Sequence, residues 1–372
     1  MATLYVSILK KKIIIIANNS WNLYNFRLEL INALVKDFDI LICCEKDSYS
    51  KYLEKYNFSI NDLKIKSSKY NFLIDIFNIL KLLKIIFYYK PTHILSFTIK
   101  PNLYANLLNL FFNFKVVSNV TGLGSVYLSK NIVNKIIFSL NKFLLRRSYH
   151  VFFQNSSDQK VIFGDEKIFI NSSVIAGSGI NLSYFHFNKV SKINNYFLFI
   201  GRIIVDKGFV EFVEAIKKIK FYHKLEINFK VAGKLDFNNP SKICKVDFEN
   251  WQKLNLFEYL GYVENNVEII NNSLCVILPS YREGLSRVLL ESMALARPII
   301  TTNVPGCKEL IENNQNGLLV APKNAEDLAN KIIQLNSLPL KKKIDMGLNS
   351  RKIVQKYDIK KVISQYKSII NQ

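Results

Sequence analysis

Cysteine and histidine are scarce in this chain of 372 residues, with five and four copies respectively. No metal-ligand spacing connects them, and the histidines form no cluster, so we expect no zinc site. Three of the cysteines lie in apolar runs that are typical of strands. We therefore expect reduced cysteines in the core of a cytosolic protein. The residues are Cys43, Cys44, Cys244, Cys275 and Cys307, with His93, His150, His186 and His223.

Acidic residues are also few: 29 Asp and Glu stand against 51 Lys and Arg, which gives a formal net charge of +22. No aspartate cluster of the kind that holds a divalent cation occurs, so we expect neither a metal nor a cofactor. Two explanations of the positive charge stay open. The chain is rich in Lys, Asn and Ile, as AT-rich genomes encode, or it is attracted to a nucleotide, a nucleic acid or an acidic membrane surface.

Long uninterrupted hydrophobic segments are missing. The first apolar run is short and ends at Lys10 to Lys12, so no signal peptide is expected. The segment closest to a membrane span is Phe72 to Tyr89, and four polar residues interrupt it: Asp75, Asn78, Lys81 and Lys84. A transmembrane helix is therefore not expected.

Apolar and aromatic residues, by contrast, are abundant. They make up 49% of the chain and include 27 Phe and 19 Tyr, which argues against disorder. The length suits two domains rather than one α/β core.

Short apolar runs alternate with helical patterns along the chain. This alternation predicts an α/β fold with two Rossmann-like halves, each built on a parallel sheet. We expect an N-terminal domain over residues 1–185, a C-terminal domain over 186–355, and a last helix over 356–372 that could pack back on the first domain. The expected strands are 13–17, 38–44, 93–97, 116–120, 151–154, 196–200, 227–232, 275–279, 299–302 and 317–320.

The most informative segment follows the strand that ends near Pro279. It contains Glu283 and Gly284 in a loop, then a helix from Ser286 that carries Glu291. In an open α/β sheet, ligands bind at the carboxyl ends of the strands. The amides at the start of the helix would face a phosphate group.

A second candidate loop follows the strand at 196–200. Gly201 allows close approach of a backbone there, and the cations Arg202 and Lys207 flank a turn, an arrangement that can clamp a diphosphate. For Glu291 two interpretations stay open: its carboxylate accepts two ribose hydroxyls, or it pairs with Arg287 one turn earlier on the helix.

These motifs resemble those of retaining glycosyltransferases of family 4, which have the GT-B fold with two Rossmann-like domains facing a central cleft. The resemblance rests on Gly201-Arg…Lys-Gly208, Pro279-Ser-Tyr-Arg-Glu-Gly284, the Glu283–Glu291 spacing and Val304-Pro-Gly-Cys-Lys-Glu309. It implies that Arg202 and Lys207 bind the donor diphosphate, and that Glu283 contacts the donor sugar and Glu291 the ribose. It also implies phosphate contacts from the backbone of Gly284, Leu285 and Ser286, and base recognition near Gly261, Tyr262 and Val263. Arg202, Lys207 and Glu283 are the expected catalytic residues.

The first half is similar to a subgroup that adds N-acetylgalactosamine or a similar sugar to undecaprenyl-diphosphate-linked sugars, through Phe97-Thr-Ile-Lys-Pro-Asn102 and Val120-Thr-Gly-Leu-Gly124. Two positions depart from the family pattern. Asn18-Asn-Ser20 stands where many members have a Gly-Gly pair. Many members also have a histidine near the acceptor at the end of the strand that is expected here at 93–97, but His93 lies too early, inside that strand. The acceptor-side candidates are therefore Asn19, Lys100, Gly122 and Gly124, with a solvated loop as the alternative for Lys100.

We therefore expect a hexosyl- or N-acetylhexosaminyltransferase that uses a nucleotide sugar, with UDP as the expected nucleotide. The acceptor would be a glycan or a lipid-linked sugar in the synthesis of a surface polysaccharide, such as lipopolysaccharide or O-antigen. A sugar-nucleotide 2-epimerase and a basic nucleic-acid-binding protein are the alternatives, and the second lacks a recognised binding module.

The expected location is cytoplasmic, peripheral on the inner face of a bacterial plasma membrane. Two segments, Phe72–Tyr89 and Asn131–Arg147, are apolar and basic. They indicate either core helices with a charged outer face or a membrane-surface patch.

Overall fold

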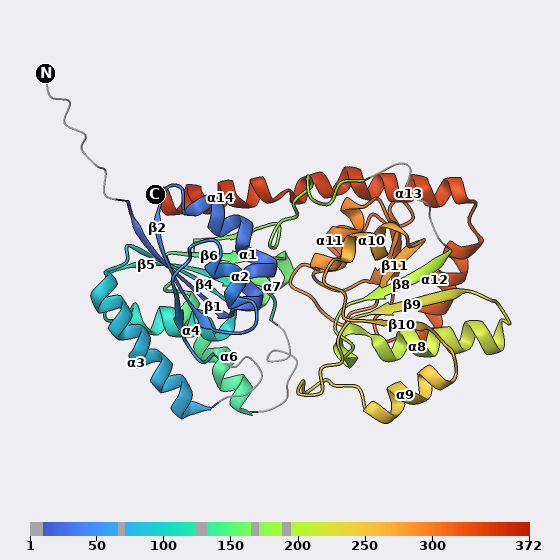
Figure 1. Cartoon of the computed structure of the whole chain (residues 1–372), viewed down its shortest axis with the longest axis horizontal. Helices are drawn as coiled ribbons and strands as arrows, with labels where there is room; N and C mark the ends of the chain where they lie inside the picture. The colour runs from blue at the N-terminus through green and yellow to red at the C-terminus, as the bar shows by residue number, and fades with distance from the viewer. Residues whose placement is uncertain (1–9, 66–70, 124–131, 165–170, 188–194) are drawn as a thin grey trace, which may run out of the picture. The chain divides into compact units, whose positions relative to one another are not determined.

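The computed structural model of the chain describes residues 10–65, 71–123, 132–164, 171–187 and 195–372. The chain divides into two compact units, of residues 1–175 with 362–372, and of residues 176–361. Each unit contains one parallel sheet flanked by helices (Figure 1).

Unit 1 contains a seven-stranded parallel sheet in the order β3-β2-β1-β4-β5-β6-β7 among its described residues. Its strands are β1 (Lys12–Asn19), β2 (Asp39–Glu45), β3 (Ile60–Asp62), β4 (His93–Phe97), β5 (Lys115–Val120), β6 (His150–Phe153) and β7 (Ser172–Val174). The helices are α1 (Ser20–Leu34), α2 (Ser50–Glu54), α3 (Phe72–Tyr89), α4 (Ile99–Leu108), α6 (Ile132–Leu145) and α7 (Ser156–Phe163).

The central strands of unit 1 are buried on both faces. The side chains of Ile13 to Ala17 are fully buried, as expected of a continuous apolar run in a parallel sheet. Helices α3, α4 and α6 cover one face of the sheet, and α1 lies on the other (Figure 1).

The last helix, α14 (Ile359–Asn371), also packs on unit 1. Tyr366 is fully buried against Phe97 and Phe152, and its hydroxyl donates to Asn119 Oδ1. Lys367 pairs with Asp37 at 2.6 Å. The chain end thus completes the core of the unit in which the chain begins.

In the part of unit 2 that the structure describes, six strands form a parallel sheet in the order β10-β9-β8-β11-β12-β13. Its strands are β8 (Tyr196–Ile200), β9 (Asn228–Ala232), β10 (Glu258–Gly261), β11 (Cys275–Leu278), β12 (Ile299–Thr302) and β13 (Gly317–Val320). The helices are α8 (Phe209–Lys217), α9 (Lys245–Lys253), α10 (Asn266–Asn271), α11 (Arg287–Ala294), α12 (Ala325–Ser337) and α13 (Leu340–Ile353).

The predicted α/β fold with two Rossmann-like parallel sheets is confirmed. One detail of the sequence interpretation is wrong: Cys244 is exposed beside α9, whereas the other four cysteines are buried. The reason is that Cys244 precedes a mostly polar helix whose single buried residue is Phe248. Within the described parts of the chain, no helix has both the length and the apolar character needed to cross a bilayer.

Candidate active site

In unit 2 the strand order reverses between β8 and β11, which lie next to each other at the centre of the sheet. The loops that follow these strands meet at the carboxyl edge, where the amide of Tyr281 donates to the carbonyl of Asp206 at 2.9 Å. A crevice at such a reversal is where open α/β sheets bind ligands. The predicted donor-binding loops, 201–208 and 279–286, are therefore adjacent.

Lys207 and Glu283 form an ion pair across this reversal, with Lys207 Nζ donating to Glu283 Oε1. Ser280 Oγ donates to the same carboxylate oxygen at 2.8 Å. Both charged side chains are mostly buried, with 19% and 15% of their side-chain area exposed. In such a site a charge interacts more strongly than it does in bulk water. A cation and a carboxylate are thus held at a fixed place on the sheet edge.

Glycine is required at two positions of these loops. Gly208 has φ +70°, and a Cβ there would lie 2.0 Å from the carbonyl oxygen of Pro279. Gly306 has φ +82°, and a Cβ would lie 2.3 Å from the carbonyl oxygen of Glu283. Only glycine allows these backbones to approach so closely.

The Val304-Pro-Gly306 turn holds the loop that carries Glu283. The amide of Glu283 donates to the carbonyl of Pro305, and the amide of Ser286 to that of Gly306, each at 3.0 Å. The amide of Gly306 in turn donates to the carboxylate of Glu309 at 2.8 Å. The Val-Pro-Gly motif therefore acts as a support that positions Glu283.

Glu291 lies on α11 and is 8% exposed. Arg287 Nε donates to its Oε1 at 3.1 Å, and Asn266 Nδ2 donates to its Oε2 at 3.3 Å. The pairing with Arg287 that the sequence left open is thus present. Asn266 begins α10, just beyond the loop after β10, so Glu291 also lies beside that loop.

Arg287 links Glu291 to a second segment of unit 2. Its Nη1 donates to the carbonyl of Gly179 at 2.6 Å, and Ser178 Oγ lies 3.4 Å away. Among the described residues no side chain caps the first turn of α11, where Ser286 is the N-cap residue. The positive end of this helix therefore faces the loop that holds Glu283.

Arg202 lies at the same edge and is more exposed. Its guanidinium is 3.8 Å from Asp236 Oδ2, and 56% of its side chain is exposed. Gly201, directly before it, approaches Gly233 so closely that a Cβ on Gly233 would lie 1.7 Å from the carbonyl oxygen of Gly201. The amide of Gly233 donates to the carbonyl of Gly261 at 2.8 Å. The ends of β8, β9 and β10 are thus drawn together.

Tyr262 and Val263 follow Gly261 in the loop after β10. Tyr262 is 52% exposed, and Gly261 has φ +71°. Gly284 and Leu285 lie in the loop before α11, where the side chain of Leu285 packs against Gly177. All the predicted donor-side residues therefore belong to unit 2 and to the loops at the carboxyl ends of its strands, or to the helix that follows β11.

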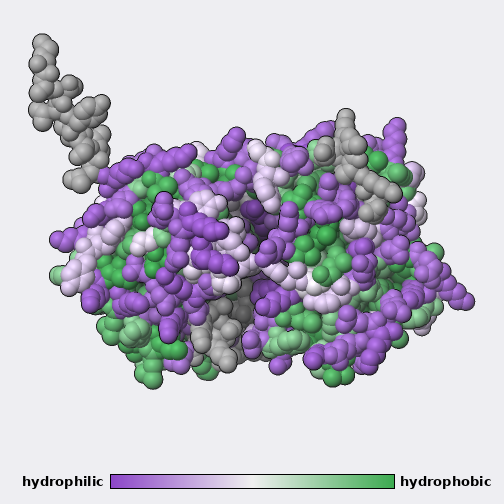
Figure 2. Space-filling model, in the orientation of Figure 1, coloured by the Kyte–Doolittle hydropathy of each residue, from purple (hydrophilic) through white to green (hydrophobic). Residues whose placement is uncertain are grey.

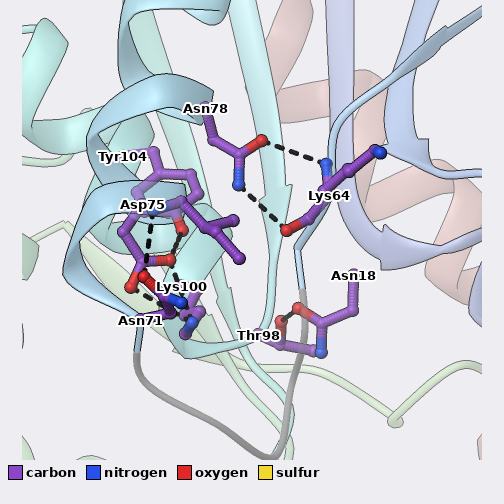
Figure 3. A network of polar contacts seen from close by, with 9 residues as sticks. Asn18, Lys64, Asn71, Asp75, Asn78, Thr98, Lys100 and Tyr104 are labelled. Atoms are coloured by element: carbon purple, nitrogen blue, oxygen red, sulfur yellow. Dashed lines mark hydrogen bonds and ion pairs between the residues drawn. The ribbon is translucent and has the colours of Figure 1, made fainter.

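The acceptor-side candidates belong to unit 1, whose strand order reverses between β1 and β4. Asn19 Oδ1 accepts from the amide of Asn22 at 3.0 Å and caps α1. Its neighbour Asn18 accepts a hydrogen bond from Thr98 Oγ1 at 2.8 Å, across the reversal (Figure 3). Thr98 has φ +80°, a strained conformation for a β-branched residue.

Lys100 is not a solvated loop residue. It pairs with Asp75 at 2.9 Å, and 11% of its side chain is exposed. The hydroxyl of Tyr104 donates to the same carboxylate, as Figure 3 shows. Burial, followed by the hydrogen bond to Asp75, raises the pKa of Tyr104 above its ordinary value. The first turns of α3 and α4 are thus joined at this edge.

Gly122 follows β5 and lines a small hollow together with Ile99, Asn102 and Asn141. Gly124 lies outside the described residues. His93 is buried at the first position of β4, at the end of the strand opposite to Thr98.

Sequence reasoning missed three residues that the structure brings to these sites. Asn266 bonds to Glu291, Ser280 bonds to Glu283, and Asn18 bonds to Thr98. The signal for Ser280 was present, because it lies three residues before Glu283 in the same loop. No local pattern pointed to Asn266, whose contact spans 25 residues.

Comparison with known proteins covers most of the chain. The family model "Glycosyl transferases group 1" matches residues 184–353, and the model "Glycosyl transferase 4-like" matches residues 12–155. Both models describe glycosyltransferases, and the chain is therefore a glycosyltransferase. The second model accounts for most of unit 1 of this glycosyltransferase.

Solved structures show the fold. The chain is similar to sucrose-phosphate synthase from Thermosynechococcus elongatus, with a TM-score of 0.81, 18% identity, and 98% and 99% of the two chains covered. It is also similar to Anabaena HepE in complex with UDP-glucose, with a TM-score of 0.79, 16% identity, and 97% and 99% covered. The predicted GT-B fold is confirmed.

Two curated relatives carry more specific names. The chain is 27% identical to the N,N'-diacetylbacillosaminyl-diphospho-undecaprenol alpha-1,3-N-acetylgalactosaminyltransferase of Campylobacter jejuni, over 93% of this chain and 94% of that protein. It is 30% identical to a capsular polysaccharide biosynthesis glycosyltransferase of Staphylococcus aureus, over 45% and 43% of the two chains.

Proposed function

We propose that this glycosyltransferase moves an N-acetylhexosamine or a related hexose from a UDP donor to a polyprenyl-diphosphate-linked sugar, with retention at the anomeric carbon. The observation that carries the proposal is the Lys207–Glu283 pair at the strand reversal of unit 2, beside the uncapped first turn of α11. The name of the Campylobacter relative supports the lipid-linked acceptor.

The donor diphosphate would lie between Lys207 and the first amides of α11. Bond breaking transfers negative charge to this diphosphate, so a fixed cation and a helix N-terminus stabilise the transition state more than the ground state. Arg202, which is half exposed, would close on the outer side of the diphosphate. The chemistry then requires positioned positive charge rather than an acid and a base.

The two carboxylates would hold the sugar nucleotide. Glu283 is oriented by Ser280 and by the Val304-Pro-Gly306 turn, so its oxygens are fixed for a hydroxyl of the donor sugar. Glu291 would accept the ribose hydroxyls, and its bonds to Arg287 and Asn266 would orient it for that purpose. The loop at Gly261, Tyr262 and Val263 would contact the base.

The acceptor would bind at the strand reversal of unit 1, near Asn18, Asn19 and Thr98. The polar groups there are partly buried amides and a hydroxyl, which suit the hydroxyl groups of a sugar. The Asp75–Lys100 pair would fix the first turn of α4 below them. A lipid-linked acceptor would bring the enzyme to the inner face of the plasma membrane as a peripheral protein.

The test is a transfer assay with purified protein, UDP-N-acetylgalactosamine, UDP-N-acetylglucosamine and UDP-glucose, each with and without a short-chain polyprenyl-diphosphate sugar. We expect UDP release that depends on the acceptor, a product heavier by one sugar, and an α-configured linkage by NMR. Epimerised donor without UDP release would contradict the proposal, and so would a β-configured product.

A further inference from the structure

The outward faces of α3 and α6 carry large apolar side chains. Phe72 and Leu73 in the first turn of α3 are 77% and 76% exposed, and Ile132 and Ile136 on α6 are 72% and 62% exposed. We call these residues, together with the exposed side chains that continue them along both helices, the α3–α6 face. The continuing residues are Ile76, Phe77, Leu80, Phe87 and Tyr88 on α3, and Val133, Leu140 and Phe143 on α6.

These side chains recur at helical spacing, opposite the residues that pack on the sheet. On α3 the buried residues are Asn78, Leu82 and Ile86, and on α6 they are Asn141, Leu144 and Leu145. A helix that is apolar all round is normally covered on both sides. Rows of large exposed apolar side chains, as on each of these two helices, are typical of interaction surfaces. The α3–α6 face therefore requires a partner.

After Asp75, the stretch of chain that carries this face has charges of one sign only. Residues 76–157 contain ten Lys and Arg and no Asp or Glu. The last acidic side chain before this stretch, Asp75, pairs with Lys100. Lys84 and Lys135 are exposed on the two helices, within the apolar rows. A second copy of the chain docked by the same face would bring like charges together, which disfavours self-association.

The first turns of both helices lie at the carboxyl edge of the unit 1 sheet, where the acceptor is proposed to bind. Asp75 in the first turn of α3 reaches Lys100 in the first turn of α4 at 2.9 Å. In Figure 2, hydrophobic surface gathers at the lower left, over the position where Figure 1 shows α3 to begin.

We propose that the α3–α6 face docks on an anionic lipid bilayer, with its apolar side chains in the headgroup region and Lys84 and Lys135 against lipid phosphates. The inference rests on the proposed function, because docking there would present the acceptor edge of unit 1 to a lipid-linked sugar. Apolar burial and attraction of cations to anionic lipids act together in such attachment.

The test is flotation of the full chain with vesicles of phosphatidylcholine alone and of phosphatidylcholine mixed with phosphatidylglycerol, an anionic lipid that attracts basic side chains. We expect binding to the anionic vesicles at least tenfold tighter than to the neutral ones, and weakening as salt rises. Equal affinity for both vesicles, or no binding to either, would overturn the inference.

Two pairs of variants assign the surface. L73S with I136S changes exposed apolar residues, and K84Q with K135Q changes exposed cations. Each pair should weaken vesicle binding by about tenfold or more. One basic residue near an anionic membrane contributes about fivefold to the affinity, and the apolar pair removes side chains whose burial in the headgroup region also contributes to binding. The matched controls lie in unit 2, where F221S with Y222S and K341Q with K342Q also change exposed residues. Controls that lose binding as strongly as the α3–α6 variants would overturn the assignment.

Two further measurements separate the outcomes. Sedimentation velocity detects a dimer that the apolar variants abolish, and such a dimer would show that a second copy covers the face. Transfer to a water-soluble acceptor should be unchanged in all four variant pairs. If the wild-type protein transfers sugar but does not bind vesicles, the docking surface alone is rejected. If it binds vesicles but transfers no sugar, the proposed function alone is rejected.

Discussion

The carboxyl edges of the two sheets use the same topology for different chemistry. In unit 2 the reversal between β8 and β11 holds a charged pair, Lys207 and Glu283. In unit 1 the reversal between β1 and β4 holds a neutral pair, Asn18 and Thr98. The fold fixes where a ligand binds. The loops decide which ligand: an anionic diphosphate suits the first edge, and sugar hydroxyls suit the second.

The supports of the two edges also differ. In unit 2 a glycine-containing turn, Val304 to Gly306, holds the reactive loop by backbone hydrogen bonds. In unit 1 the corresponding support is a side-chain network around Asp75 (Figure 3). The predictions below test this contrast between a charged pair at the strand reversal of the donor edge and a neutral pair at the strand reversal of the acceptor edge.

The largest effect is expected for Lys207→Ala. We expect kcat to fall by about 100- to 1000-fold, because a fixed charge at the developing negative charge is removed. Steady-state UDP release measures the change. Lys234→Ala is the control, since Lys234 is an exposed lysine in the loop after the neighbouring strand β9. Activity of Lys207→Ala near that of the control would remove Lys207 from the transition state.

Glu291→Gln separates the two interpretations of this carboxylate. We expect the donor's KM to rise by about tenfold, since a hydrogen bond to a charged group contributes about 1.5–3 kcal/mol. Donor titrations of initial rate measure it, with thermal unfolding alongside. A lower melting temperature at an unchanged KM would show that Glu291 serves only to pair with Arg287.

Two glycines with the same backbone conformation test the close packing of the donor edge. Gly208 and Gly261 have φ +70° and +71°, but only at Gly208 would a Cβ meet a neighbour, Pro279. Gly208→Ala should therefore be less stable than Gly261→Ala by about 1–3 kcal/mol, the usual cost of overpacking. Chemical denaturation compares them, and equal losses would show that backbone strain alone matters.

In unit 1 the Asp75–Lys100 pair should contribute to stability rather than to chemistry. Removing one partner of a buried pair leaves the other charge without compensation, so Lys100→Ala should destabilise unit 1 by about 2 kcal/mol. The double variant with Asp75→Ala should recover part of that loss. A large fall in kcat without loss of stability would instead identify Lys100 as a catalytic residue.

The smallest expected effect is a loss of folding stability at acidic pH. Burial, followed by repulsion from Lys11 and Lys115, lowers the pKa of His93 to about 4. The unfolded chain binds this proton more readily, so stability falls as pH drops from about 6.5 toward 4. Between pH 7 and pH 5.5 we expect a loss of about 1 kcal/mol, which His93→Asn should remove. An unchanged pH slope in that variant would show that folding does not lower the pKa of His93.

The sequence predicted the buried centre of both sheets well, because runs such as Ile13–Ala17 and Ile299–Thr302 are apolar throughout. It missed β3 and β7, which are three residues long and lie at the sheet edges. Half-buried strands of this length carry too few side chains for a periodic pattern to appear. The sequence pattern of Asn25 to Lys36 predicted a helix there, and the structure has α1 beginning earlier, at Ser20, because Asn19 supplies an N-cap.

The site could be predicted only where residues lie close in sequence. Glu283 and Glu291 share one strand–loop–helix segment, so their motif was visible. The pairing of Lys207 with Glu283 spans 76 residues and depends on the neighbouring positions of β8 and β11. The sequence also did not decide which side of α3 and α6 faces outward. Both helices are apolar in nearly every turn, and only the packing shows which side is buried.

Amide hydrogen exchange with saturating UDP tests the central claim most directly, namely that unit 2 alone holds the donor nucleotide. The account predicts slower exchange at residues 201–208 and 283–291, with unchanged exchange at residues 18–20 and 98–102. Protection confined to the unit 1 segments, or no protection in either unit, would contradict it.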